Sequence, residues 1–371
     1  MRILIITGSF PHMQCGVGDY THCLVESLAI NSNNKLAVLT SIEVRLKNRK
    51  YSIFPIIKKW SISEIFTYLS CLKKWQPDVI HIQFPTQGYG AGFLPLFIPF
   101  INFLCSIKTV HTWHEGYEPK HFLRVLLKSF FAASLIFVRK NYIKKNLGIM
   151  SRWIVKEKKI FFIESASVIP ESNLTELELK NIKNFYLRQQ SRLIVFFGFV
   201  YPMKGVDLLF SIANPEIDKI VIIGNIDFDS DYTKLLFKFL NGSDWYGKST
   251  ITGHLSATKV SNLLRVADAV ILPFRNGCGE WNSSLHAARL NNAFVISTSN
   301  SASGYNAVMN TYFAEIDNIQ EMRTALDQYC KNPRKYSKYK PNNSDQWRRI
   351  ANQHESVYKE VLAHGKFKSK N

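Results

Sequence analysis

The sequence predicts an α/β protein of two domains, each built on a parallel β-sheet with crossover helices. Its 371 residues are too many for one ordinary core and suit two domains of about 150–190 residues each. Short apolar runs alternate with helical patterns, which is the rhythm of parallel strands joined by helices. This rhythm stops at a polar, charged stretch near residue 175 and then starts again.

The individual elements follow from apolar periodicity and from glycine and proline positions. In the first half, strands are expected at 2–7, 35–40, 78–83 and 108–112, and helices at 18–28, 62–75 and 121–137. In the second half, strands are expected at 192–198, 217–224, 269–272 and 294–298, and helices at 205–212, 258–267, 283–290 and 345–362.

These elements predict a first domain at 1–171, a linker at 172–190 and a second domain at 191–342. Residues 343–371 are expected to form a helix that packs back toward the first domain, followed by a basic tail.

The composition is that of a globular protein, with 46% apolar and 20% charged residues. The six cysteines include no C-x-x-C pair, which argues against a zinc site or a disulfide scaffold and fits a reducing compartment. The apolar start of the chain is too short for a signal peptide. Residues 93–107, interrupted by Pro95 and Pro99, are fewer than the roughly 20 that span a bilayer, so no transmembrane helix is expected.

The net charge of +19 is concentrated in the first half of the chain. Residues 1–170 hold 22 Lys and Arg against 9 Asp and Glu, or +13, and many of these cations stand beside apolar residues, as in 121–140. A basic and apolar surface suits the anionic inner face of the cell membrane. A solvated basic face is the plainer interpretation. Nucleic acid is not expected as a partner because no recognition motif accompanies the charge.

Two candidate site segments lie in the first half. The loop after the first strand contains Gly8 and Gly16 and leads into a helix, whose N-terminus suits diphosphate oxygens. It lacks the dinucleotide-binding spacing, and a plain turn is the alternative. His114 and Glu115 follow a strand whose carboxyl end lines the expected ligand crevice, where they could contact a sugar or remain hydrated edge residues.

The strongest candidate in the second half is Lys204, beside Gly205 at the start of a helix after the first strand of that domain. An ammonium group and a helix N-terminus at one point neutralise a pyrophosphate leaving group well.

The loop at 272–288 is the other candidate in the second half. Backbone amides and hydroxyls there could hold phosphate oxygens, with Glu280 or His286 reaching a ribose or sugar hydroxyl. The residues expected to contact the donor are Gly279, Asn282, Ser283 and Ser284. The same serines could instead simply cap the helix.

The acidic series Asp227, Asp229 and Asp231 imitates a metal-binding motif. It falls in an expected solvated loop and has no matching ligands elsewhere in the sequence, so metal binding is not expected there.

Taken together, these segments resemble one family, the GT-B-fold glycosyltransferases of the glycosyltransferase family 4 type. The matches occur in family order at 16–20, 77–83, 112–114, 198–207, 221–224, 252–256 and 267–274, and in the helix that contains His354 and Tyr358.

The resemblance implies two Rossmann-like domains whose parallel sheets face each other across a cleft. It implies a nucleotide sugar held mainly by the second domain and transferred with retention to a glycan or lipid-linked acceptor. No metal is implied, because Lys204 and helix dipoles neutralise the diphosphate. His114 matches the position that contacts the transferred sugar, Gly16 the loop near the donor phosphates, and Glu280 remains a catalytic candidate. Many such proteins build bacterial surface polysaccharides at the inner membrane, which predicts a cytoplasmic, peripheral location.

The sequence departs from the family at two places. Phe199 stands where many relatives carry an arginine, and no alignment of 278–288 completes the usual pair of glutamates eight residues apart. The residue that holds the ribose is therefore not assigned. A nucleotide-sugar epimerase, a sugar phosphorylase or a non-catalytic partner subunit of the same fold are the alternatives.

Overall fold

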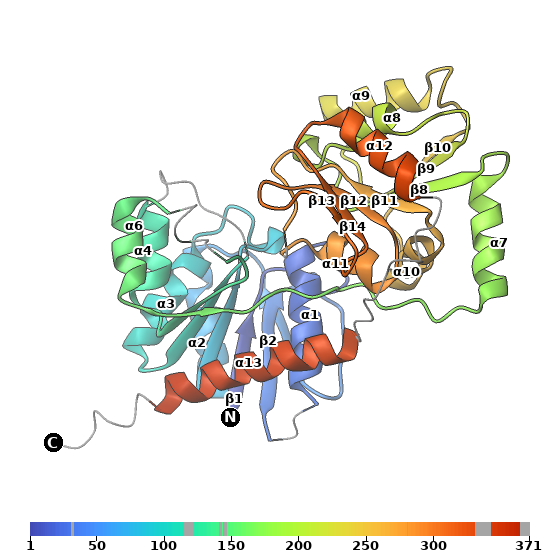
Figure 1. The fold of residues 1–371 in the computed structure, drawn as a ribbon. Helices are drawn as coiled ribbons and strands as arrows, with labels where there is room; N and C mark the ends of the chain where they lie inside the picture. Colours follow the sequence, from blue (N-terminus) through green and yellow to red (C-terminus); the bar gives the residue numbers. More distant parts are fainter. Residues whose placement is uncertain are drawn as a thin grey trace. The chain divides into compact units, whose positions relative to one another are not determined.

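The computed structural model describes residues 1–30, 33–114, 122–140, 143, 147–279, 281–330 and 343–363. The chain divides into two compact units (Figure 1). The first unit comprises Met1–Ser165 and the chain from Ser344 onward, and the second comprises Ala166–Asn343.

The first unit is built on a seven-stranded sheet in which every neighbouring pair is parallel, in the order β3-β2-β1-β4-β5-β6-β7. The strands are β1 (Arg2–Ile6), β2 (Lys35–Ser41), β3 (Ser52–Ile57), β4 (Val79–Phe84), β5 (Lys108–Trp113), β6 (Ser134–Phe137) and β7 (Lys159–Phe162). Near-continuous apolar runs form the central strands because helices cover a parallel sheet on both faces.

The helices of the first unit are α1 (Gly16–Leu28), α2 (Ile65–Trp75), α3 (Leu94–Leu104), α4 (Phe122–Phe130), α6 (Ile149–Lys156) and α13 (Asn343–Ala363). Helix α3 packs on α4, and α4 packs on α6 (Figure 1). None of the helices within the described ranges has both the length and the apolar character needed to cross a bilayer.

The helix predicted at 121–137 is wrong over its second half. Helix α4 ends at Phe130, and Ser134–Phe137 form strand β6, which pairs with β5 and with β7. All four residues of β6 are buried. A short apolar run after a helix has the same composition whether it continues the helix or enters a sheet, so periodicity does not separate the two.

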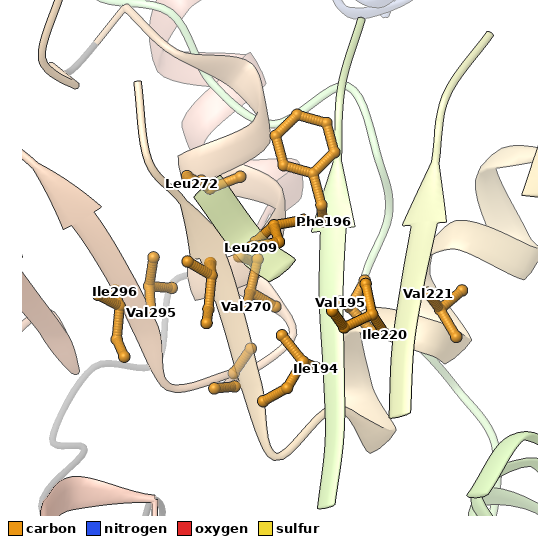
Figure 2. Close-up of a cluster of buried hydrophobic side chains, with 14 of the residues drawn as sticks. Ile194, Val195, Phe196, Leu209, Ile220, Val221, Val270, Leu272, Val295 and Ile296 are labelled. Atoms are coloured by element: carbon orange, nitrogen blue, oxygen red, sulfur yellow. The ribbon is translucent and has the colours of Figure 1, made fainter. Parts of the chain in front are cut away.

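The second unit repeats the architecture with strand order β10-β9-β8-β11-β12-β14-β13. Among the paired strands of the described residues, β13 pairs antiparallel with β14, and the other neighbouring strands pair parallel. The strands are β8 (Arg192–Phe197), β9 (Asp218–Ile223), β10 (Ser249–Gly253), β11 (Ala269–Leu272), β12 (Val295–Thr298), β13 (Gly304–Asn306) and β14 (Thr311–Ala314). Side chains from β8, β9, β11 and β12 form the centre of its core (Figure 2).

The helices of the second unit are α7 (Glu176–Leu187), α8 (Leu209–Ile212), α9 (Asp231–Leu240), α10 (Ala257–Val266), α11 (Ser283–Leu290) and α12 (Ile319–Tyr329). Residues 172–190, predicted as a linker, lie inside this unit instead. Helix α7 starts with a capping box between Thr175 and Glu178 and buries Leu179 in the core. Because α7 buries so few side chains, the stretch has the composition of an exposed connection.

Candidate functional site

The carboxyl edge of the second sheet has a topological switch point between β8 and β11. These strands are neighbours, but the chain runs from β8 to β9 on one side and from β11 to β12 on the other. Ligands of open α/β sheets bind at such points, just beyond the ends of the strands. The loops that contain Lys204 and Gly279–Ser284 follow β8 and β11, so the two segments predicted from the sequence flank this switch point.

Close backbone contacts hold three segments together at this edge. Gly198, directly after β8, has a φ of +151°, and a Cβ there would lie 3.2 Å from the hydroxyl of Ser284. A Cβ on Gly224, directly after β9, would lie 2.0 Å from the carbonyl oxygen of Gly198. The absence of side chains at the two glycines therefore lets the first turn of α11 and the ends of β8 and β9 meet.

Lys204 ends a short 3₁₀ turn (Pro202–Lys204) and is partly buried. Its ammonium nitrogen lies 4.1 Å from the centre of the Phe274 ring, which belongs to the loop after β11. Gly205 has a left-handed φ of +65°, and a Cβ there would lie 2.1 Å from the carbonyl oxygen of Pro273. Gly205 thus lets the two loops touch, and Phe274 holds the cation at the switch point through a cation–π contact.

An ion pair outside the set of predicted site residues joins the same two loops. Arg275 donates two parallel hydrogen bonds to the carboxylate of Asp207, at 2.9 and 2.7 Å. Tyr232 donates to the same carboxylate at 2.6 Å, and Arg275 also donates to the carbonyl oxygen of Pro202. Partial burial alone would raise the pKa of Asp207, but Arg275 and Tyr232 outweigh it and lower that pKa. The sequence feature that could have indicated this pair is Arg275 itself, a cation that directly follows a strand and the dipeptide Pro273-Phe274.

The loop before α11 is closed by its own residues. The side-chain oxygen of Asn282 accepts from the amide of Gly279 at 2.9 Å, and the amide of Asn282 donates to the carbonyl oxygen of Gly279 at 2.9 Å. Asn282 is the N-cap residue of α11, yet its side chain makes no capping bond. The amide of Gly279 and the side-chain oxygen of Asn282 therefore bond each other. Ser283 and Ser284, at the start of the helix, are the other predicted phosphate contacts of this loop. Glu280 lies outside the described residues.

The predicted site residues of the first unit lie at its own sheet edge. His114 directly follows β5, and its Nε2 donates to the side-chain oxygen of Gln83, at 2.7 Å. Burial lowers the pKa of His114 to about 3, and the nearby side chains of His354 and Arg139 contribute to the same shift. His114 is therefore a neutral imidazole at pH 7, and its other ring nitrogen is an acceptor. Glu115 lies outside the described residues.

Gln83 links His114 to His81, which is fully buried. The amide nitrogen of Gln83 lies across the ring of His81, 3.1 Å from Nε2 and 3.4 Å from Nδ1. The ring nitrogens of His81 reach the hydroxyls of Tyr358 at 2.6 Å and of Thr112 at 2.7 Å. Gln83, His81 and Tyr358 thus form a connected polar set behind His114.

Gly16 is the exposed first residue of α1. A Cβ on Gly18 would lie 3.0 Å from the carbonyl oxygen of Ser9, so the N-terminus of α1 packs on the loop after β1. Tyr20, one turn along α1, meets the His114 ring edge to face with centroids 4.7 Å apart. The first unit therefore brings the N-terminal turns of α1 and His114 to one place.

The acidic series near α9 has local partners. Asp227 accepts from the amide of Asp229, Asp231 pairs with Lys234, and Ser230 caps the helix. Within the described part of the chain, no three His, Cys, Asp or Glu side chains form a group that could hold a metal ion.

The chain is similar over its whole length to solved glycosyltransferase structures. A glycosyltransferase from Rickettsia africae superposes with a TM-score of 0.68 at 14% identity, covering 97% of this chain and 98% of that one. Anabaena HepE in complex with UDP-glucose gives 0.67 at 14% identity, covering 99% of each chain. WaaG, a glycosyltransferase of lipopolysaccharide biosynthesis, gives 0.59 at 12% identity, covering 98% of each.

The chain has the GT-B fold. This confirms the predicted fold class of two Rossmann-like domains built on parallel sheets. No protein-family profile matches the sequence, and no curated protein sequence is similar to it. In this GT-B chain, the described candidate residues form two separate sets, one around Lys204 in the second unit and one around His114 in the first.

Proposed function

We propose that the protein transfers a sugar from a nucleotide-sugar donor to an acceptor hydroxyl. The observation that carries the proposal is the position of Lys204, held on Phe274 at the switch point of the second sheet. The N-terminus of α11, with Ser283 and Ser284, belongs to the same edge. A cation and a helix N-terminus suit the charge that develops on a diphosphate leaving group.

In the proposed reaction, the bond between the anomeric carbon and the diphosphate oxygen breaks. The acceptor oxygen bonds to the same carbon, and nucleoside diphosphate and a proton are released. Lys204 and the α11 N-terminus stabilise the departing diphosphate without a metal ion, so chelators leave the activity unchanged. His114 is neutral and hydrogen-bonds a sugar hydroxyl, and the N-terminus of α1 at Gly16 lies beside it. The proposal also includes retention of the anomeric configuration of the transferred sugar.

Three further parts of the proposal concern the biological setting. HepE has been solved with UDP and UDP-glucose, which supports a nucleotide sugar as the donor class here. The likeness to WaaG supports a glycan or lipid-linked acceptor in bacterial surface polysaccharide synthesis. A cytoplasmic protein, peripheral at the inner face of the membrane, fits such an acceptor.

A panel of nucleotide sugars screened by thermal shift tests the proposal. The true donor at about 100 times its Kd adds about 2.7 kcal/mol to the free energy of unfolding, whereas other donors add less. The stabilising donor is then incubated with the enzyme, and released nucleoside diphosphate is measured. A donor that binds but is neither hydrolysed nor transferred would assign the chain to the non-catalytic partners. Release of a new nucleotide sugar, without free diphosphate, would assign it to the epimerases.

A further inference from the structure

Three neighbouring helices of the first unit leave large apolar side chains in contact with water. On α6, Ile149 is 85% exposed and Trp153 is 70% exposed, with Met150 beside them. On α4 the exposed apolar residues are Leu123 and Phe130, and on α3 they are Phe100, Phe103 and Leu104. We call these eight side chains the apolar face.

The helices that carry the apolar face pack on one another, and the exposed rings of α3 and α4 meet in one cluster. Helix α3 packs on α4 and α4 on α6, and the three lie side by side in Figure 1. The ring of Phe131 lies 4.9 Å from Phe100, 5.3 Å from Phe103 and 5.0 Å from Phe130, measured between centroids. Contiguous exposed apolar surface of this kind marks an interaction site.

The charges on the same helices are all of one sign. Helices α3, α4 and α6 carry four cations, Arg124, Lys128, Arg152 and Lys156, and no carboxylate. Lys128 is buried, whereas Arg124, Arg152 and Lys156 are exposed. Helix α7 of the second unit, which also exposes apolar residues, balances two lysines with two glutamates. The bias is therefore not shared by every helix of this basic chain, although α2 and α10 also carry two cations each and no carboxylate.

We infer that the apolar face of α3, α4 and α6 inserts into the surface of an anionic lipid bilayer, with Arg124, Arg152 and Lys156 contacting the phosphate headgroups. Exposed Ile, Met and Trp beside Arg and Lys are what interfacial helices present to a membrane. The cations snorkel to the headgroups while the apolar side chains enter the acyl boundary. This inference refines the membrane location proposed above and does not depend on sugar transfer.

Vesicle sedimentation tests the charge contribution. The probe is phosphatidylcholine vesicles with or without phosphatidylglycerol, and the wild-type chain sediments with the anionic ones. Each cation near an anionic surface strengthens binding about fivefold, so the double variant Arg124→Gln/Lys156→Gln binds about 25-fold more weakly. The matched control, Lys238→Gln/Lys259→Gln, removes two exposed cations of the second unit and loses less than about threefold. Equal losses in the two variants would overturn the inference.

A second variant tests the apolar contribution. The triple change Ile149→Gln/Met150→Gln/Trp153→Gln lowers binding at least about tenfold. Its control, Leu177→Gln/Phe185→Gln/Phe228→Gln, replaces side chains of the second unit that are about equally exposed and leaves binding unchanged. Unaltered circular dichroism of each variant shows that the fold is kept.

Two outcomes would assign the apolar face to something else. If the triple variant sediments like the wild type, the face does not enter lipid. If the wild type forms a concentration-dependent dimer without lipid, and the triple variant is a monomer that still binds vesicles, the face covers a second copy of the chain. If the wild type binds vesicles but transfers no sugar, the proposed activity is refuted and this inference still stands.

Discussion

The hydroxyl oxygen of Tyr358 lies 2.6 Å from Nδ1 of His81, and both side chains are fully buried. His81 belongs to strand β4 and Tyr358 to helix α13, 277 residues apart in the chain. The other ring nitrogen of His81 lies 2.7 Å from the Thr112 hydroxyl. This contact attaches the last described helix to the centre of the first sheet, directly behind Gln83 and His114.

Removal of the Tyr358 hydroxyl should destabilise the first unit. Tyr358→Phe removes the closest hydrogen-bond partner of a buried ring nitrogen of His81, which costs about 1–3 kcal/mol. Urea unfolding measures the change. Tyr246→Phe is the control, because Tyr246 is 74% exposed, and its effect stays within about 0.5 kcal/mol. Equal stability of the two variants would show that the contact contributes nothing.

Gln83 should keep His114 neutral and oriented. Gln83→Glu places a carboxylate beside His114 and raises its pKa from about 3 toward the neutral range. If transfer requires neutral His114, the variant loses kcat as the pH falls toward about 5, whereas the wild type does not. Gln83→Met, which adds no charge, lowers kcat without creating the acid limb. A pH profile of Gln83→Glu parallel to that of the wild type would refute the role of Gln83.

Lys204 should act mainly on the chemical step. Lys204→Ala lowers kcat/KM for the donor by about 10²–10³-fold, as expected for loss of one preorganised charge at a leaving group. Lys259→Ala, an exposed lysine of the same unit, is the control and keeps wild-type rates. Release of nucleoside diphosphate is the readout. Full activity of Lys204→Ala would remove Lys204 from the site.

The Asp207–Arg275 pair should stabilise the loops that flank the switch point. Asp207→Asn costs about 1.5–3 kcal/mol at pH 7, because two charge-assisted hydrogen bonds are lost. The pKa of Asp207 is lowered by folding, so its contribution is present above the unfolded pKa of about 4 and is lost as the pH falls further. The stability difference between wild type and Asp207→Asn should therefore shrink in acid. A double-mutant cycle with Arg275→Met, followed by urea unfolding, isolates the coupling. A difference that stays constant down to pH 3 would contradict it.

The elements that could be predicted from the sequence are those with a local signal. Helix α11 (Ser283–Leu290) and strand β11 (Ala269–Leu272) were predicted with their observed bounds, since polar residues or proline delimit both. Strand β6 was missed because its identity depends on pairing with β5 and β7, which no local pattern shows. Helix α3 was not assigned because Pro99 interrupts it, yet its buried apolar side chains pack in the core and hold it.

In the candidate site, too, features with a local sequence signal could be predicted, and features that depend on distant strand pairing could not. Lys204 and His114 could be named from the sequence because each directly follows a predicted strand. The contact between Lys204 and Phe274 could not, because it depends on the adjacency of β8 and β11, which are far apart in the chain. The donor contact of Asn282 stays a prediction, and the hydrogen bond that its side-chain oxygen accepts from the amide of Gly279 could not be foreseen. Hydrogen bonds of this kind depend on loop conformation and not on residue type.

The return of α13 to the first unit affects the order in which the chain can fold during synthesis. The second unit is continuous in sequence and can complete its sheet while α13 is still inside the ribosome. The first unit, although its strands are made earlier, then still lacks the partner that covers His81 and the Trp347 ring that packs on Tyr20. The earlier-made half of the protein is therefore the later one to reach its final packing, and the surface around His81 stays uncovered until α13 has been made.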